Sequence, residues 1–173
     1  MDEAAERFDL QRIKTIGETY MAVCGLTTAR LDHALRTVNF AQAAMALAHQ
    51  RNENLTLQIG IDSGPVISGV VGSKKFQFEL WGETVNIAHH IQTVAELNTI
   101  LVTENVYKRV HEQFNLRPAP PVAHYEQEIQ VYRVATGADG DAAVDAPTVD
   151  AAAASAMAAH RAPAATIVRA EVA

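Results

Sequence analysis

The sequence predicts an α+β domain, because segments with helical spacing alternate with segments of strand character over residues 1–135. Apolar residues recur every three or four positions in Arg30–Gln50, which is typical of a helix that buries one face. They recur at every second position in Leu55–Ile61, which is typical of a strand. A hairpin of β-branched strands near the start adds an antiparallel pair to this mixture.

The hairpin is predicted from two short segments, Arg12–Ile16 and Thr19–Cys24, that flank a two-residue loop. Glycine at the first loop position, Gly17, suits a type II′ turn. Lys14 falls in the middle of a strand, where a charge is costly without a partner or ligand. It is either a ligand-reading group or a lysine that extends its ammonium group to the sheet surface. Glu18 falls at the tip, either as a solvated turn residue or as a group that meets a metal ion.

The other elements follow along the chain. Thr103 is the expected N-cap of a helix, and Phe76, Phe78 and Trp81 are expected in the core or at a subunit contact. Three more helices are predicted at Asp2–Phe8, Thr84–Glu96 and Glu104–Glu112, and four more strands at Val66–Val71, Phe76–Trp81, Ile100–Val102 and Ile129–Val134.

The composition changes near Gly137, where the chain becomes rich in alanine. The following residues include no Phe, Tyr or Trp and few large apolar residues. Such a segment cannot bury enough apolar surface to offset the entropy lost on ordering. We therefore expect residues 136–173 to form a low-complexity disordered tail after a domain at residues 1–135.

The net charge of −6 is spread over 173 residues with acidic and basic groups interspersed. No basic patch stands out, which argues against nucleic acid as a partner. No apolar run approaches the roughly 20 residues of a membrane span, and the acidic start does not resemble a signal peptide. Cys24 is the single cysteine, so neither a disulfide within the chain nor a zinc cluster is expected. These features favour a soluble, cytoplasmic protein.

Four motifs together carry a family resemblance: residues 12–26, 60–66, 69–72 and 78–88. In this order and spacing they resemble the catalytic domain of class III nucleotide cyclases, the adenylate and guanylate cyclases. The resemblance covers residues 10–135 and implies a ferredoxin-like α+β fold. The family domain begins with a strand, an Asp-containing Gly-Phe-Thr loop and a long helix. The resemblance implies that this segment is missing before Asp2, so a truncated domain without its first strand and helix is expected.

The resemblance also implies a reaction, the conversion of ATP to cyclic AMP and pyrophosphate at a dimer interface. The ribose 3′-hydroxyl attacks the α-phosphate, assisted by two metal ions, Mg²⁺ or Mn²⁺, that two aspartates hold. One aspartate aligns with Glu18, and the other lies in the missing segment. Glutamate is one methylene longer, and Mg²⁺ demands near-ideal octahedral geometry. A weakened metal site is therefore expected.

The remaining site residues are assigned through the same resemblance. Lys14 aligns with the purine-reading residue and matches the adenine-selective choice, and Glu79 takes the place of its partner that accepts from the adenine amino group. Asn86 matches the asparagine that orients the ribose and the reacting phosphate. His90 stands where the family has an arginine that stabilises the transition state, although it also fits an ordinary surface histidine of a helix. His124 lies in the stretch where the family has a lysine that grips the triphosphate.

Three functional hypotheses follow. The first is an adenylate cyclase domain that binds ATP, with weak or no activity in the isolated chain, as a homodimer or a heterodimer with another cyclase domain. The second is a catalytically degenerate nucleotide-binding or regulatory partner of an intact cyclase domain. The third is a non-functional gene fragment.

Overall fold

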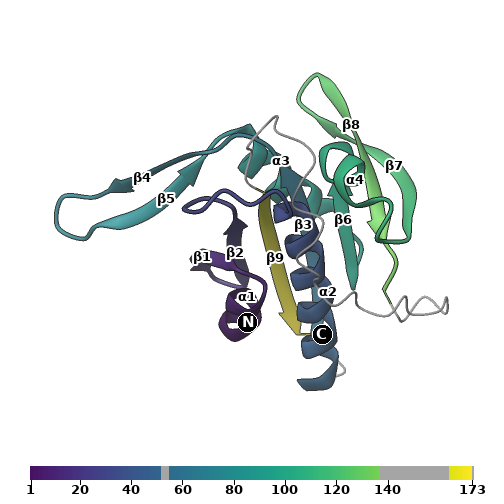
Figure 1. Cartoon of the computed structure of the whole chain (residues 1–173), viewed down its shortest axis with the longest axis horizontal. Helices are drawn as coiled ribbons and strands as arrows, with labels where there is room; N and C mark the ends of the chain where they lie inside the picture. Colours follow the sequence, from purple (N-terminus) through teal and green to yellow (C-terminus); the bar gives the residue numbers. More distant parts are fainter. Residues whose placement is uncertain (52–54, 137–163, 173) are drawn as a thin grey trace.

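The computed structural model describes residues 1–51, 55–136 and 164–172, the last range as backbone. It confirms the α+β class: helices cover a mixed sheet, and a two-stranded arm extends from it (Figure 1). The helices are α1 (Asp2–Arg7), α2 (His33–Arg51), α3 (Glu83–Val94) and α4 (Glu104–Val110). The strands are β1 (Leu10–Ile16), β2 (Thr19–Cys24), β3 (Leu55–Ser63), β4 (Ile67–Val71), β5 (Gln77–Trp81), β6 (Thr99–Thr103), β7 (Leu116–His124), β8 (Gln127–Val134) and β9 (Ala164–Val172).

The main sheet has seven strands in the order β1-β2-β9-β3-β6-β8-β7. Strands β3 and β6 pair in parallel, and every other neighbouring pair is antiparallel. The β1–β2 hairpin therefore joins the rest of the sheet through β9, the strand coloured yellow in Figure 1.

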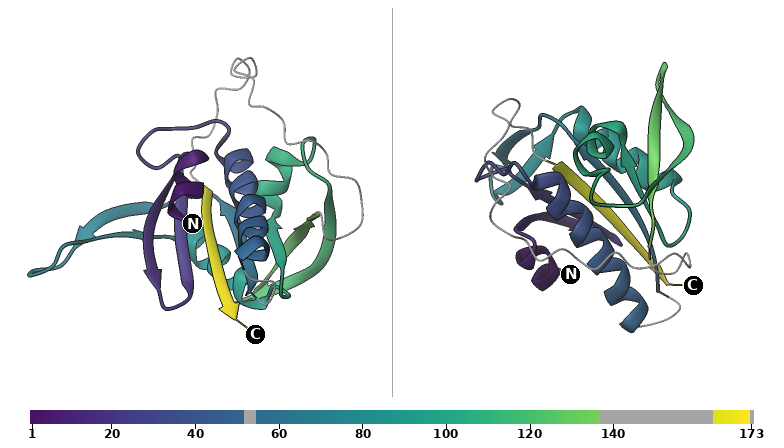
Figure 2. Two further views of the ribbon diagram at one scale, coloured as in Figure 1. Left: turned by 90° about the horizontal axis from the view of Figure 1, so that it is seen from below. Right: turned by 45° about the vertical axis from the view of Figure 1, so that its right-hand side comes forward.

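Helices pack on both faces of this sheet, so its central strands are buried on both sides (Figure 2). Tyr20 and Ala22 of β2 belong to the core cluster formed with α1, α2 and α4. The alternate residues Met21 and Val23 pack with Val85 and Ala88 of α3 on the other face. This follows from the alternation of side chains along a strand and explains why β2 reads as a nearly continuous apolar run.

The β1–β2 turn has the expected form. Ile16 pairs with Thr19 across the two-residue loop, and Gly17 adopts a φ of 57°, as the first position of a type II′ turn requires. A β carbon at Gly17 would meet nothing within 4 Å. Glycine is thus favoured here by backbone conformation and not by space.

Strands β4 and β5 form an arm that projects from the body of the domain (Figure 1). Its apolar side chains are exposed: Phe76 is 76% exposed, Val70 65% and Trp81 43%. Phe76, Phe78 and Trp81 were expected in the core or at a subunit contact. All three are exposed, so the core is excluded, and a contact with another subunit stays a prediction.

Two strands were not expected from the sequence. Strand β7 contains Pro118, Pro120 and Pro121. Proline is tolerated there because β7 lies at the edge of the sheet, where one row of backbone groups needs no partner. Strand β9 lies within the segment expected to be a disordered tail. Residues 137–163 of that segment lie outside the described residues, whereas residues 164–172 pair with β2 and β3.

No helix among the described residues is long and apolar enough to cross a membrane.

Candidate functional site

Lys14 and Glu79 come together from two elements that are far apart in the sequence. Lys14 lies on β1 and Glu79 on β5, and the Lys14 Nζ donates to Glu79 Oε2 in an ion pair. A bulge in β1 precedes the lysine, because Arg12 pairs with Ala22 and Lys14 with Met21. Bulges of this kind redirect the side chains of a strand. The exposed fractions of the two side chains, 32% and 21%, leave the pair accessible to a ligand.

Asn86 and His90 lie on α3, which follows β5 directly in the chain. Asn86 is exposed in the first turns of the helix. His90, one turn later, donates from Nε2 to the carbonyl oxygen of Ala123 at 2.7 Å. Its ring centroid lies 4.9 Å from that of His124, whose Nε2 is 3.0 Å from Glu83 Oε1.

His90 and His124, which the family resemblance aligns with an arginine and with the stretch that holds a lysine, are thus neighbours. The hydrogen bond of His90 and the contact of His124 with Glu83 are both made within the domain. Sequence reasoning missed this arrangement, because Glu83 and His124 are distant in sequence and no local motif joins α3 to β7.

Glu18 is exposed at the tip of the β1–β2 turn. Within the described ranges, no contact joins its carboxylate to Lys14, Glu79, Asn86 or His90, and no group of three or more His, Cys, Asp or Glu side chains could hold a metal ion. A single turn carboxylate falls short of the two-carboxylate site that the family resemblance implies. The described side chains therefore do not fit a two-metal centre by themselves.

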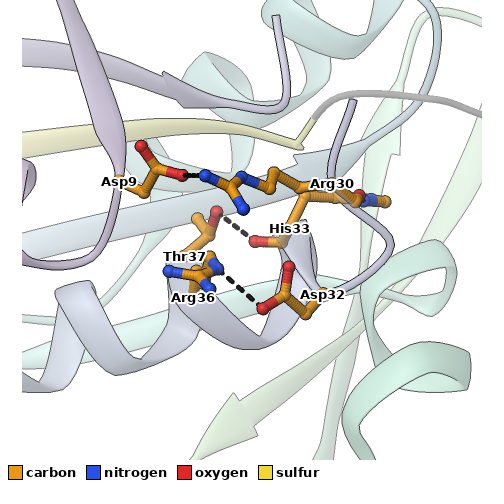
Figure 3. A network of polar contacts seen from close by, with 6 residues as sticks. All are labelled: Asp9, Arg30, Asp32, His33, Arg36 and Thr37. Atoms are coloured by element: carbon orange, nitrogen blue, oxygen red, sulfur yellow. Dashed lines mark hydrogen bonds and ion pairs between the residues drawn. The ribbon is translucent and has the colours of Figure 1, made fainter. Parts of the chain in front are cut away.

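The start of α2 is fixed by polar contacts that tie it to the root of the hairpin (Figure 3). Arg30 forms an ion pair with Asp9, which precedes β1. At the start of the helix, the Arg36 Nε donates to Oδ2 of Asp32, the residue before α2, at 2.7 Å, and the Thr37 hydroxyl donates to the His33 carbonyl at 2.7 Å. The Asp9–Arg30 pair thus links the hairpin to the start of α2, and the other two contacts stabilise the first turn of the helix.

His33 and Ser63 form a buried hydrogen bond that the sequence did not predict. His33 Nδ1 lies 2.7 Å from the carbonyl oxygen of Arg30, which can only accept, so this nitrogen carries the proton. Nε2 then accepts from the Ser63 hydroxyl at 2.9 Å. Burial lowers the pKa of His33, consistent with this neutral ring. Both residues are about 3% exposed, so the pair joins α2 to β3 and does not face a substrate.

Asp62 is a second buried polar group on β3, and it is 2% exposed. Thr103 Oγ1 donates to Asp62 Oδ1 at 2.5 Å, and Asn105 Nδ2 lies 3.5 Å from the same oxygen. Thr103 does occupy the N-cap position of α4, but its side chain makes no capping hydrogen bond there. Burial raises the pKa of Asp62, and the hydrogen bonds oppose that rise.

A raised pKa in the folded state means that the domain loses stability as the Asp62 carboxyl ionises. The free energy of unfolding of the natural chain, relative to an Asp62→Asn variant, should therefore fall as the pH rises above 3.8. Urea unfolding of both proteins at pH 4–7 measures this difference in unfolding free energy. His33 contributes with the opposite sign, but it is present in both proteins, so its contribution cancels in the comparison. Parallel curves for the two proteins would contradict the assignment.

Comparison with known proteins identifies the domain type. The model of the family described as "Adenylate and Guanylate cyclase catalytic domain" matches residues 1–133. An adenylate cyclase of Mycobacterium tuberculosis is 35% identical over 120 residues, covering 67% of this chain and 27% of that protein. A membrane guanylyl cyclase of Dictyostelium discoideum is 31% identical over 136 residues, covering 76% of this chain and 9% of that protein. The chain thus spans about a quarter or less of the length of these relatives.

A solved structure has the same fold. The guanylate cyclase domain from Catenaria anguillulae, crystallised in complex with GTP, superposes with a TM-score of 0.74 at 28% sequence identity. The match covers 78% of this chain and 77% of that one.

Proposed function

Because this chain belongs to the adenylate and guanylate cyclase catalytic domain family, we propose that it binds adenine nucleotides and has little cyclase turnover by itself. The observation that carries the proposal is the ion pair between Lys14 and Glu79. It offers one donor and one acceptor side by side from two strands.

This donor and acceptor complement the edge of adenine. Adenine presents an acceptor at N1 and a donor at its N6 amino group, whereas guanine presents a donor at N1 and an acceptor at O6. Lys14 would donate to adenine N1 and Glu79 would accept from N6. A lysine offers only donors, and an ionised carboxylate offers only acceptors. Guanine in the same orientation would therefore place its N1 donor against the Lys14 donor and its O6 acceptor against the Glu79 acceptor.

Asn86 is placed by the family resemblance at the ribose and the reacting phosphate, and its exposed position on α3 is compatible with that role. The side chains that would bind the triphosphate are less suited to it than the family residues with which they align. His90 donates to a backbone carbonyl and His124 contacts Glu83. His90 lacks the bidentate fork of an arginine, and His124 lacks the long, flexible stem and ammonium group of a lysine. Losing one such transition-state group commonly costs about a hundredfold or more in rate.

Mg²⁺ or Mn²⁺ would polarise the phosphates in an active member of the family. Because the described side chains do not make the two-carboxylate site, we assign no step of this chain to a metal ion. Glu18 is the one residue of the hairpin tip that could contribute a carboxylate ligand from this domain.

A second cyclase domain is the proposed partner, either another copy of this chain or a different one. The support is the β4–β5 arm, whose exposed apolar side chains are typical of interaction surfaces. The exposed set comprises Ile67, Val70, Val71, Phe76, Phe78 and Trp81. Such a partner could supply the catalytic groups that this domain lacks. The same contact would allow this chain to act as a regulatory partner of an intact cyclase domain.

Calorimetry and a turnover assay test this proposal together. The purified chain should bind a non-hydrolysable ATP analogue at least tenfold more tightly than the GTP analogue. With ATP and Mn²⁺, it should form cyclic AMP only at trace rates. Turnover near one per second, a typical enzyme rate being about 10 per second, would contradict the low activity. Absence of binding to either analogue would contradict the nucleotide-binding role.

A further inference from the structure

We infer that residues 164–172 act as a positioning strand, whose insertion between β2 and β3 holds the Lys14-bearing hairpin against the half of the domain that carries Asn86. That the strand docks between β2 and β3 follows from the sheet topology alone. Its consequence for nucleotide binding rests on the proposed function.

In the described sheet, β9 lies between β2 and β3. It pairs with β2 from Thr19↔Arg169 to Cys24↔Ala164 and with β3 from Leu55↔Val172 to Ser63↔Ala164. Strands β2 and β3 have no pairing with each other. Without β9, backbone groups along both facing edges would lose their partners inside a sheet whose two faces are covered, and such groups are costly to leave unpaired.

The candidate site residues are distributed over both sides of β9. Lys14 and Glu18 lie on the hairpin side of β9, whereas Asn86 and His90 lie on α3, which packs on the other part of the sheet. Side chains also connect the two parts: the ion pairs Asp9–Arg30 and Lys14–Glu79, and the packing of Met21 against α3. These contacts tether the hairpin, but β9 supplies its only backbone pairing to the rest of the described sheet.

Strand β9 is far along the chain from the strand that precedes it. Residues 135–163 lie between the end of β8 and the start of β9, and they include no Phe, Tyr or Trp. Strands β8 and β9 are not neighbours in the sheet, so the order of the strands along the chain does not by itself bring β9 to its place. Recognition of this kind, an extended segment added to open strand edges, relies on main-chain hydrogen bonds.

A single substitution tests whether the strand docks within its own chain. Cys24 is directly opposite Ala164 in the β2–β9 register, and directly opposed residues of antiparallel strands lie within the range that a disulfide spans. Refolding the Ala164→Cys chain with oxidised glutathione should give a crosslinked monomer in most molecules. The Ala165→Cys variant, which faces Val23 instead, is the matched control and should remain uncrosslinked. Equal crosslinking in both variants, none in either, or a crosslinked dimer would overturn docking within the chain.

A second variant tests the positioning role. Ile167 pairs with Met21 on one side and Gly60 on the other, and proline there removes the amide donor from a central strand. The Ile167→Pro chain should show amide exchange at least tenfold faster in β2 and β3, with β7 and β8 changed less than twofold. The Ile167→Val chain, which keeps the amide donor at this position, is the control and should exchange like the natural chain. Unchanged exchange in β2, or equal acceleration in β7 and β8, would overturn the inference.

Nucleotide binding distinguishes failure of the positioning role from failure of the proposed function. If the natural chain binds the ATP analogue, the Ile167→Pro chain should bind it at least tenfold more weakly, and equal affinity would overturn the positioning role. If the natural chain binds no nucleotide, the proposed function fails, whereas the disulfide and exchange results still decide whether β9 docks.

Discussion

Replacing Gly60 by alanine is expected to destabilise the domain by about 3 kcal/mol or more, at the upper end for overpacked sites. Helix α3 crosses β3 at this glycine. A β carbon there would lie 2.2 Å from the carbonyl oxygen of Ala88, 2.6 Å from the Gln92 amide nitrogen and 2.8 Å from the Gln92 β carbon. Two of these are backbone atoms of the helix, so no change of side-chain rotamer relieves the clash. The helix must move away from the sheet.

Chemical denaturation followed by circular dichroism measures this effect. Gly69→Ala is the matched control, because a β carbon at Gly69 would meet the Trp81 ring at 3.3 Å on the exposed arm, where the ring can shift. We expect its unfolding free energy to change by less than about 0.5 kcal/mol. Similar midpoints for the Gly60 variant and the natural chain would show that α3 does not approach β3 as closely as described. Since α3 carries Asn86 and His90, the Gly60 variant should also lose nucleotide binding.

Reversing the charge of Lys14 is expected to weaken ATP binding by at least about tenfold, because the donor to adenine is replaced by an acceptor. The Lys14→Glu chain also places a second carboxylate beside Glu79, which removes the ion pair and introduces repulsion. A modest loss of stability, about 1 kcal/mol or less, is expected because both side chains are partly solvated.

The double variant, Lys14→Glu with Glu79→Lys, separates base recognition from simple loss of the pair. It restores opposite charges but exchanges the positions of donor and acceptor. Its stability should recover toward that of the natural chain, while its preference should shift from the ATP analogue toward the GTP analogue. Calorimetry with both analogues provides the measurement. An unchanged preference for ATP in the double variant would mean that Lys14 and Glu79 do not read the base.

Much of the fold could be predicted from local patterns. The β1–β2 hairpin, α2 and the β4–β5 arm follow from strand alternation, helical spacing and turn residues, and all three are present. Strand β7 was missed because proline normally argues against a strand, and its edge position is a property of the assembled sheet. Strand β9 was missed because its alanine-rich surroundings dominate the composition of the segment.

The candidate site was predictable only where a sequence motif carries it. Lys14 and Glu79 were paired on the family resemblance, and the structure brings them into contact; their role toward a base stays a prediction. The contact between Glu83 and His124 joins a helix to an edge strand and has no local signal. The buried groups Asp62 and His33 were not singled out, since burial of a polar residue follows from tertiary packing.

The position of β9 also has a consequence for how the domain is made. The last strand along the described chain is a central strand of the sheet, so its pairings with β2 and β3 are among the most distant in sequence. Synthesis from the N-terminus means that β2 and β3 leave the ribosome well before the strand that joins them. Distant pairings slow folding and leave strand edges open to aggregation. We therefore expect a nascent chain stalled before residue 164 to remain protease-sensitive in β2 and to require chaperone protection until the sheet closes.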